Sequence, residues 1–183
     1  LPVIAITNPP TPNDSVCSYD PPINLTATPV GGTWSQTQGG GLSGSTLTPS
    51  PANVGQNQLV YSYTDANGCS SSANTSIFVL PKPSPLVVTA GAPTCIGLPS
   101  NNITASGVLS NATVNWFNTT DLSSNPVNTG SSYDPNVTSP TDYYVNQEVD
   151  GCFSDTTGVT VLFSDSPLAS FTANPTSGDR PLT

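Results

Sequence analysis

The residues best suited to chemistry in this chain are its four cysteines, which occupy matching places in the two halves of the sequence. Cys17 and Cys69 in the first half are echoed by Cys95 and Cys152 in the second. No histidine is present, so a thiol or hydroxyl nucleophile would lack its usual base. No two cysteines have the close spacing of zinc-finger ligands. The cysteines therefore predict disulfide bonds formed in an oxidising compartment.

Two bridges that each stay within one half agree with the duplication. They would join Cys17 to Cys69 and Cys95 to Cys152, while free thiols or a bridge between the halves are the alternatives. One detail conflicts with this pairing. In each half the first cysteine precedes the second expected strand and the second cysteine follows the penultimate one, which places them at opposite ends of a standard β-sandwich. Either the bridge is then peripheral or the expected strand ends are misplaced.

Aromatic residues repeat together with the cysteines. Trp34 and Tyr61 are echoed by Trp116 and Tyr144, at offsets of 82 and 83 residues, and each of these tyrosines stands eight residues before the second cysteine of its half. A fixed period of this length is typical of tandem copies of one domain. Such copies more often act as spacers or binding units than as enzymes, and we expect no enzymatic activity.

Neighbouring aromatic residues in the second half give a candidate contact for a glycan or a protein partner. Successive residues of a strand face opposite ways. If Trp116 and Tyr144 point into the core, Phe117 and Tyr143 point outward, where exposed rings can stack on sugars or dock against another chain. The alternative is that loops or the adjoining domain cover both rings.

Acidic side chains could serve hydrolysis or metal binding. Paired carboxylates for glycoside hydrolysis could come from Asp142, Glu148, Asp150 and Asp155, but we expect these to be solvated acids at strand ends and turns. Glu148, Asp150 and Asp155 flank one turn and are weak calcium candidates. Residues 65–68 (Asp-Ala-Asn-Gly) predict a hairpin turn, because Asn-Gly accepts the positive φ angles of tight turns. We expect no other metal and no cofactor.

Charge and composition exclude several partners. The formal net charge is −9, with only two basic residues against eleven acidic ones. Phosphate backbones require Lys and Arg, so nucleic acid is excluded as a partner, and an anionic membrane surface is disfavoured. No apolar run of membrane length is present, so we expect no direct insertion into a membrane.

The expected elements are short strands. Twenty prolines and fifteen glycines interrupt helices, and no window shows a convincing helical period, so we predict an all-β fold built of tandem immunoglobulin-like β-sandwiches. The expected strands cover residues 2–7, 23–28, 33–35, 46–48, 58–64, 76–80, 86–89, 102–106, 113–117, 142–146, 158–163 and 168–171.

These strands divide the chain into a string of domains. A first sandwich is expected over residues 1–82, a second over residues 83–166 and the opening strand of a third over residues 167–183. Alternating prolines in residues 81–85 hold the chain extended, so the first linker is expected to be a stiff spacer.

Three motifs resemble known repeat families. Residues 29–35 (Pro-Val-Gly-Gly-Thr-Trp-Ser) with residues 61–69, and residues 114–117 with residues 141–145, resemble immunoglobulin-like repeats of large secreted surface proteins of Bacteroidota. Residues 169–175 are similar to the start of a polycystic-kidney-disease-type domain.

This resemblance implies an extracellular stalk or adhesin segment at the bacterial cell surface and carries over no catalytic residue. Its partners would be neighbouring repeats of the same polypeptide, with surface glycans or other copies of the chain as further candidates. The resemblance also implies O-glycosylation signals at Ser15 and Thr156. Alternative functions are a carbohydrate-binding region of a secreted glycanase and a filament subunit that assembles by strand addition through the strand near Phe171.

Overall fold

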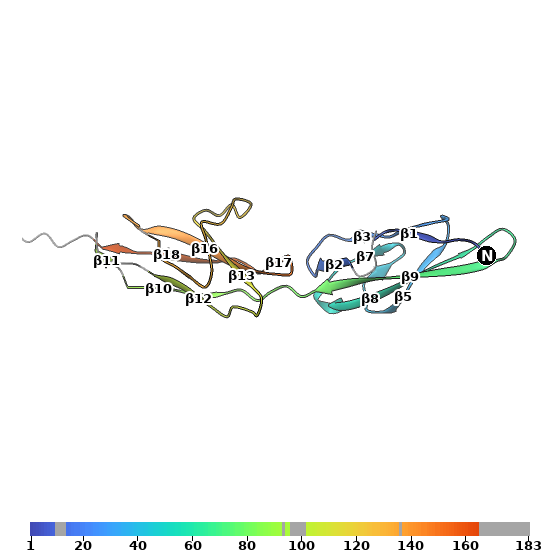
Figure 1. The fold of residues 1–183 in the computed structure, drawn as a ribbon, viewed down its shortest axis with the longest axis horizontal. Helices are drawn as coiled ribbons and strands as arrows, with labels where there is room; N and C mark the ends of the chain where they lie inside the picture. The colour runs from blue at the N-terminus through green and yellow to red at the C-terminus, as the bar shows by residue number, and fades with distance from the viewer. Residues whose placement is uncertain (10–13, 93, 96–101, 136, 165–183) are drawn as a thin grey trace, which may run out of the picture.

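The protein consists of two β-sandwich domains arranged end to end, as seen in a computed structural model (Figure 1). It describes residues 1–9, 14–92, 94–95, 102–135 and 137–164. The first residues lie at one end of the elongated molecule and strands β11 and β18 reach toward the other. The expected all-β fold of tandem sandwiches is confirmed. The strand expected near Phe171, and with it the start of a third domain, lies outside the described residues.

The first domain is built from nine strands and one short 3-10 turn. A four-stranded sheet has the order β2-β9-β8-β5, and a pair β1-β4 and a three-stranded sheet β3-β7-β6 form the opposite layer. The strands are β1 (Ala5–Asn8), β2 (Asp14–Cys17), β3 (Ile23–Asn24), β4 (Thr26–Thr28), β5 (Thr33–Gln38), β6 (Leu42–Ser43), β7 (Thr46–Leu47), β8 (Gly55–Thr64) and β9 (Ser70–Leu80), and the turn covers Pro51–Asn53.

Alternating side chains of these strands form the core of the first domain. Leu59 of β8 and Ile77 of β9 point from the large sheet onto Leu25 and Leu47, and all four are almost fully buried. Trp34 packs at the edge of this cluster against Tyr61, with ring centroids 5.0 Å apart. The period-two pattern that predicted these strands is therefore the pattern that fills the core.

The second domain repeats this plan with different strand lengths. Its large sheet has the order β14-β13-β16-β17 with β18 also paired to β16, and β10-β12-β15 forms the opposite layer. The strands are β10 (Val87–Ala90), β11 (Thr94–Cys95), β12 (Ile103–Ser106), β13 (Thr113–Phe117), β14 (Asn128–Thr129), β15 (Ser132–Tyr133), β16 (Thr141–Val149), β17 (Cys152–Phe153), β18 (Thr157–Val161) and β19 (Phe163–Ser164).

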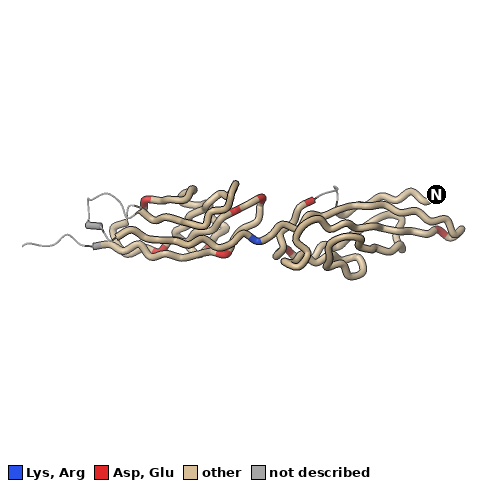
Figure 2. The backbone as a smooth tube through the Cα atoms, turned by 90° about the horizontal axis from the view of Figure 1, so that it is seen from below, with Lys and Arg blue, Asp and Glu red and all other residues tan. Residues whose placement is uncertain are grey.

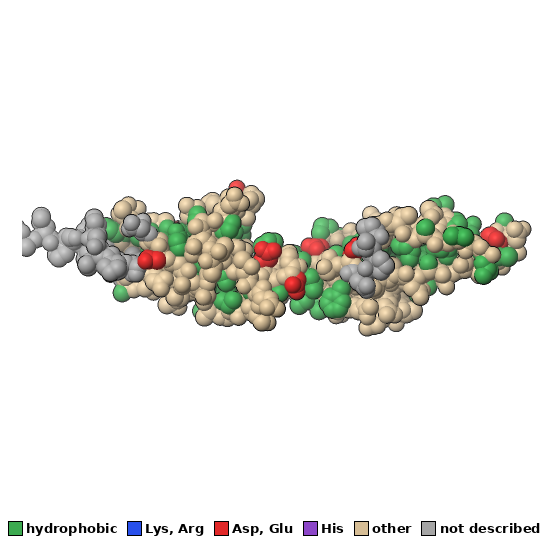
Figure 3. All heavy atoms as spheres, viewed as in Figure 1, with side chains coloured by type: hydrophobic (Ala, Val, Ile, Leu, Met, Phe, Trp, Pro, Cys, Tyr) green, Lys and Arg blue, Asp and Glu red, His purple; other side chains and the backbone are tan. Residues whose placement is uncertain are grey.

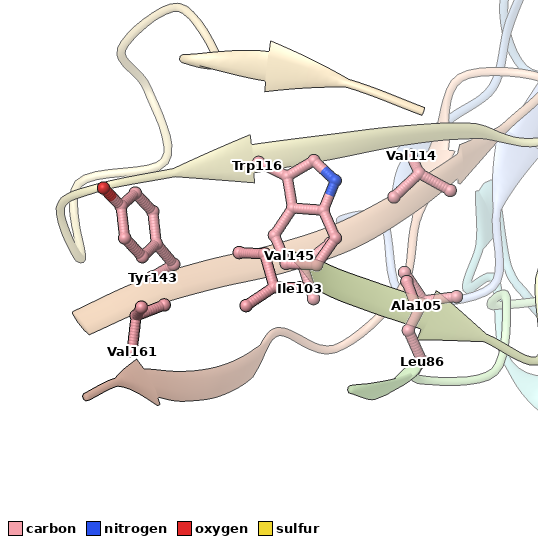
Figure 4. Close-up of a cluster of buried hydrophobic side chains, with 8 residues drawn as sticks. All are labelled: Leu86, Ile103, Ala105, Val114, Trp116, Tyr143, Val145 and Val161. Atoms are coloured by element: carbon pink, nitrogen blue, oxygen red, sulfur yellow. The ribbon is translucent and has the colours of Figure 1, made fainter. Parts of the chain in front are cut away.

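Trp116 is the centre of the second core (Figure 4). Its ring is fully buried beside Val145 and Ile103, and its indole Nε1 donates a hydrogen bond to the carbonyl oxygen of Gly130 at 2.7 Å. Tyr133 and Tyr143 meet edge to face, with centroids 5.5 Å apart. The two domains therefore have separate cores, each anchored by its own tryptophan.

Two strands that the sequence did not reveal each contain the first cysteine of a domain. They are β2 and β11, which run parallel to β9 and β19 respectively. The short, polar sequence of β2 gave no periodic signal. The turn predicted at residues 65–68 is confirmed as the β8–β9 hairpin, in which the Asp65 carboxylate accepts hydrogen bonds from the backbone amides of Asn67 and Cys69, both at 2.9 Å.

The Gly-Gly-Thr-Trp motif is explained by one close approach. Tyr61 donates its hydroxyl proton to the Pro29 carbonyl at 2.6 Å and accepts the Gly32 amide at 2.7 Å. A Cβ at Gly32 would lie 2.5 Å from the Tyr61 ring, so only glycine fits there.

In the described parts of the chain no helix is long and apolar enough to cross a membrane.

Separate cores lead to a first prediction. Leu59→Ala should lower the free energy of unfolding of the first domain by about 2–5 kcal/mol, because it leaves a cavity under a fully buried side chain. Hydrogen exchange read by mass spectrometry should show faster exchange in β8 and β9 and unchanged protection in β13 and β16. Leu162→Ala, at a side chain that is 53% exposed, is the matched control and should change little. Equal loss of protection in both domains would contradict separate cores.

A second prediction concerns alkaline pH. Burial raises the pKa of Tyr143 above its ordinary value of 10.0, and Tyr133 raises it further. A raised pKa in the folded state gives stability that is fully present below pH 10 and is lost as the pH rises through the folded-state pKa. Denaturant unfolding between pH 9 and pH 11 should therefore show a steeper loss of stability for the second domain than in Tyr143→Phe. Parallel curves for the two proteins would contradict it.

Candidate functional site

A disulfide bond between Cys17 and Cys152 connects the two domains. These residues are 135 positions apart, with Cα atoms 5.7 Å apart, and belong to different domains. Cys69 is a free, exposed thiol. The predicted pairings of Cys17 with Cys69 and of Cys95 with Cys152 are therefore wrong, and the alternative of a bridge between the halves is the one observed. The joint between the domains is the candidate functional site.

Strand β2 positions the cysteine of the first domain. It runs parallel to β9, so that Cys17 lies beside Leu80, the last residue before the linker. The next residue, Ser18, continues this pairing by donating its amide to the Leu80 carbonyl at 2.9 Å. The Asp20 carboxylate accepts the Cys17 amide at 2.8 Å. The turn formed by residues 17–20 therefore holds the Cys17 sulfur and Tyr19 at the end of the first domain that faces the second domain.

A tight hairpin positions the cysteine of the second domain. Strands β16 and β17 are joined by Asp150 and Gly151, whose φ angles are 51° and 83°. Positive φ at both central residues is typical of the two-residue turn that matches the twist of antiparallel strands. Val149 and Cys152 face each other across the ladder, so Cys152 stands directly at the hairpin tip.

The linker is fastened to the second domain soon after it leaves the first. Pro83 is buried, and the carbonyl oxygen of the next residue, Ser84, accepts a hydrogen bond from the side-chain amide of Gln147 at 2.8 Å. Gln147 is fully buried. Its Nε2 also donates to the Gly107 carbonyl at 3.3 Å, and its Oε1 accepts the Leu109 amide at 2.9 Å. Only residues 81–83 are thus left between the two anchored ends.

Polar contacts complete the joint on the side of the linker. Lys82 forms an ion pair with Asp155, and its ammonium group lies 5.6 Å from the centre of the Tyr19 ring. The Tyr19 hydroxyl accepts the backbone amide of Phe153 at 2.6 Å. Lys82 is the sole basic residue of the described ranges, and Figure 2 shows it between the domains. Because the ion pair is exposed, it contributes at most about 1 kcal/mol.

Together these contacts limit how the domains move. A single flexible tether would leave the domains free to swing, which is the usual expectation for a small interface. Two covalent connections at separate points, the linker and the bridge, leave at most rotation about the line that joins them. The Tyr19 hydrogen bond and the Lys82 ion pair oppose that rotation. Figure 3 shows a narrow waist at this place, so the stiffness comes from these few connections and not from a broad interface.

The aromatic pair proposed as a glycan or partner contact is not exposed. Phe117 is 4% exposed and Tyr143 is 7% exposed. Tyr143 belongs to the core beside Trp116, so its predicted outward direction is wrong. The alternative that these rings are covered is the one observed. The prediction placed Tyr144 on the same face of the sheet as Trp116. In the structure Val145 faces Trp116 across the ladder and Tyr144 faces Phe117, so the observed register differs from the predicted one by one residue.

Tyr144 is the half-buried ring of this region. It packs over Gly158, where a Cβ would lie 3.5 Å from the ring, and it lines a small hollow with Thr120, Leu122 and Thr156. The repeat aligned Tyr144 with Tyr61 and so assigned Tyr144 to the core, whereas its neighbour Tyr143 is the ring that the core contains.

The remaining candidates are separate surface residues. Among the described residues no group of three acidic, cysteine or histidine side chains is placed to hold a metal ion. Glu148, Asp150 and Asp155 do not converge, and Asp155 pairs with Lys82. Ser15 and Thr156, named as O-glycosylation signals, are both exposed. Their modification stays a prediction.

Sequence reasoning missed Tyr19, Lys82, Gln147 and Phe153. The signal for the joint was nevertheless present in the cysteine positions. Two cysteines at opposite ends of one sandwich cannot meet inside it, whereas each lies next to a cysteine of an adjacent domain when sandwiches are joined end to end. The conflict noted in the strand pattern therefore indicated a bridge between domains.

Comparison with protein families connects the second domain to a described type. Residues 81–164 match the family described as "Ig-like domain CHU_C associated". The match begins in the linker and ends at β19, so it covers one complete sandwich. No curated protein matches the chain. The fold and the joint define a protein of tandem immunoglobulin-like domains.

The solved structures that match the chain share little sequence with it. The fibronectin(III)-like modules of CbhA from Clostridium thermocellum have 16% identity and a TM-score of 0.44, over 94% of this chain and all of that one. Titin domains A168–A170 have 15% identity and a TM-score of 0.46, over 89% of this chain and 66% of that one. Protocadherin gammaB7 has 15% identity and a TM-score of 0.31, over 90% of this chain and 47% of that one.

A third prediction tests the anchoring of the linker. Gln147→Leu should lower the free energy of unfolding of the second domain by about 1–3 kcal/mol, because it removes the three hydrogen bonds that this fully buried side chain makes to the backbone. The Leu109 amide, which donates to Gln147, should exchange faster. Gln56→Leu, at an exposed position of β8, is the matched control. Unchanged exchange at Leu109 would show that Gln147 does not hold this region.

Proposed function

We propose that the chain is a semi-rigid segment of a stalk on the bacterial cell surface, which holds other parts of a larger extracellular protein away from the cell. The observation that carries this proposal is the bridge between Cys17 and Cys152 across the joint. An enzyme would place its specialised residues in a cleft, whereas this chain concentrates them where one domain meets the next.

The shape supports the same role. The chain enters at one end of the elongated molecule, and its last described strands, β18 and β19, belong to the domain at the other end (Figure 1). Further domains added at either end would extend the length without widening the molecule. Neighbouring repeats of the same polypeptide are then the natural partners of both ends.

Redox chemistry and the family match of the second domain support a location at the cell surface. A structural disulfide persists in an oxidising environment outside the cytosol. The match of residues 81–164 to a CHU_C-associated immunoglobulin-like domain and the resemblance to Bacteroidota surface repeats both support the cell surface. The glycan-binding alternative loses its main support, because Phe117 and Tyr143 are buried.

A fourth prediction tests stiffness directly. Small-angle scattering of the isolated monomer, with the Cys17–Cys152 bridge formed, should give an elongated two-domain particle with a well-defined distance between domain centres. The variant Cys17→Ser with Cys152→Ser should keep both domains folded but give a broader distribution of this distance, because the second covalent connection is lost. Cys69→Ser, which removes a thiol outside the joint, is the control, and its monomer should match the monomer of the unchanged protein. A compact particle, or identical distributions with and without the bridge, would contradict a stiff stalk.

A further inference from the structure

The free thiol of Cys69 occupies the same structural position as the bridged Cys152. Each follows a glycine with positive φ at the tip of a hairpin, Gly68 (81°) and Gly151 (83°). Each hairpin joins the strand that faces the domain's tryptophan to the strand that follows it. Cys152 uses this position to reach a cysteine of the preceding domain. Cys69 presents the same group at the far end of the first domain.

Cys95 occupies the backbone position that corresponds to Cys17. In the first domain, the short strand β2 runs parallel to β9 and pairs Cys17 with the last residue of that strand. In the second domain, the short strand β11 runs parallel to β19 and pairs Cys95 with Ser164, again the last residue of its strand. Each domain therefore carries its first cysteine at the end through which the chain leaves and its second cysteine on a hairpin at the opposite end.

The observed bridge obeys this polarity, since it joins the first cysteine of one domain to the second cysteine of the next. The remaining two cysteines lie on elements at opposite ends of the molecule, with β11 at one end and the β8–β9 hairpin at the other (Figure 1). They are too far apart to bond within one molecule, because a disulfide requires Cα atoms within about 7 Å. Their positions match those of the two cysteines that form the observed bridge, so they could join one molecule to the next in the same way.

We propose that Cys69 forms a disulfide with Cys95 of a second copy of the chain, joining copies head to tail through cysteines at the same backbone positions as those of the joint between its own domains. The hairpin that carries Cys69 is ordered by the Asp65 carboxylate, which accepts the Cys69 amide at 2.9 Å. The thiol is exposed, so a partner can reach it without unfolding. This inference rests on the positions of the cysteines and does not depend on the proposed stalk function.

The bond forms by thiol–disulfide exchange with a disulfide oxidant such as glutathione disulfide. The Cys95 thiolate attacks glutathione disulfide, giving a mixed disulfide and one glutathione thiolate. The Cys69 thiolate then attacks the Cys95 sulfur and expels the second glutathione. Two cysteine thiols lose two protons and two electrons in total, and one glutathione disulfide is reduced to two glutathione molecules.

The new joint would lack the polar contacts of the existing one. At the same sequence offsets from the cysteines, Ser72 corresponds to Asp155 and Gly97 corresponds to Tyr19. The carboxylate and the tyrosine hydroxyl of the existing joint therefore have no equivalent at these two sequence positions. The connection between copies would therefore depend on the disulfide alone, and reduction should separate them.

The test is oxidation of the full 183-residue chain with glutathione disulfide over a range of protein concentrations. We expect a ladder of linear oligomers on non-reducing gels, which collapses to monomer on reduction. After cleavage on the carboxyl side of aromatic residues, which separates Cys69 from Cys95 at Phe78, mass spectrometry should identify Cys69–Cys95 as the linking bond. Cys69→Ser and Cys95→Ser should each abolish the ladder while leaving the Cys17–Cys152 bridge intact.

A displaced thiol controls for random collision. Cys69→Ser with Ser45→Cys moves an exposed thiol to the turn between β6 and β7. Its linked species should be at least about tenfold fewer, because a disulfide needs aligned Cβ vectors. Equal oligomerisation of this control, predominant Cys69–Cys69 dimers, or a Cys69 that ends only as a glutathione adduct would each overturn the proposal. None of these results would alter the scattering test of the stalk, which compares monomers with and without the Cys17–Cys152 bridge and uses Cys69→Ser only as a control.

Discussion

The bridge between Cys17 and Cys152 is the constraint on which the arrangement of this protein depends. Each sandwich has its own core and needs nothing from its neighbour to bury it. What the neighbour supplies is orientation. Because the bridge and the linker connect the domains at two places, a chain of small domains with a narrow waist acquires stiffness without a large apolar interface.

Most of the fold could be predicted from the sequence. Alternating strands such as β8 and the Asn-Gly hairpin after it are local patterns, and the repeated tryptophans mark the two cores. Strand β2 was missed because its polar residues have no period, and its pairing with β9 depends on residues more than sixty positions away. Tyr143 was assigned to the wrong face because the repeat aligned Tyr144 with Tyr61, whereas Val145 is the residue that faces Trp116 across the ladder.

The disulfide was the least predictable part of the site, for a physical reason. Sequence symmetry favours one bridge per copy, but a bridge needs proximity, and proximity in a tandem array is set by how the domains stack. The two cysteines of each domain lie at opposite ends of its sandwich. Duplication of such a domain therefore brings together cysteines of neighbouring domains, although the sequence repeat had suggested a bridge within each domain. Composition limits the ion pairs of the joint, because Lys82 is the one basic side chain in the described ranges.

Peptide mapping of the non-reduced protein tests the bridge most directly. Cleavage before aspartate releases Cys17 in a peptide of residues 14–19 and Cys152 in a peptide of residues 150–154, while Cys69 and Cys95 remain together in residues 65–120. We predict that the two short peptides are recovered joined to each other and separate on reduction. Recovery of the Cys17 peptide attached to residues 65–120 would contradict the bridged joint and, with it, the stiff arrangement of the two domains.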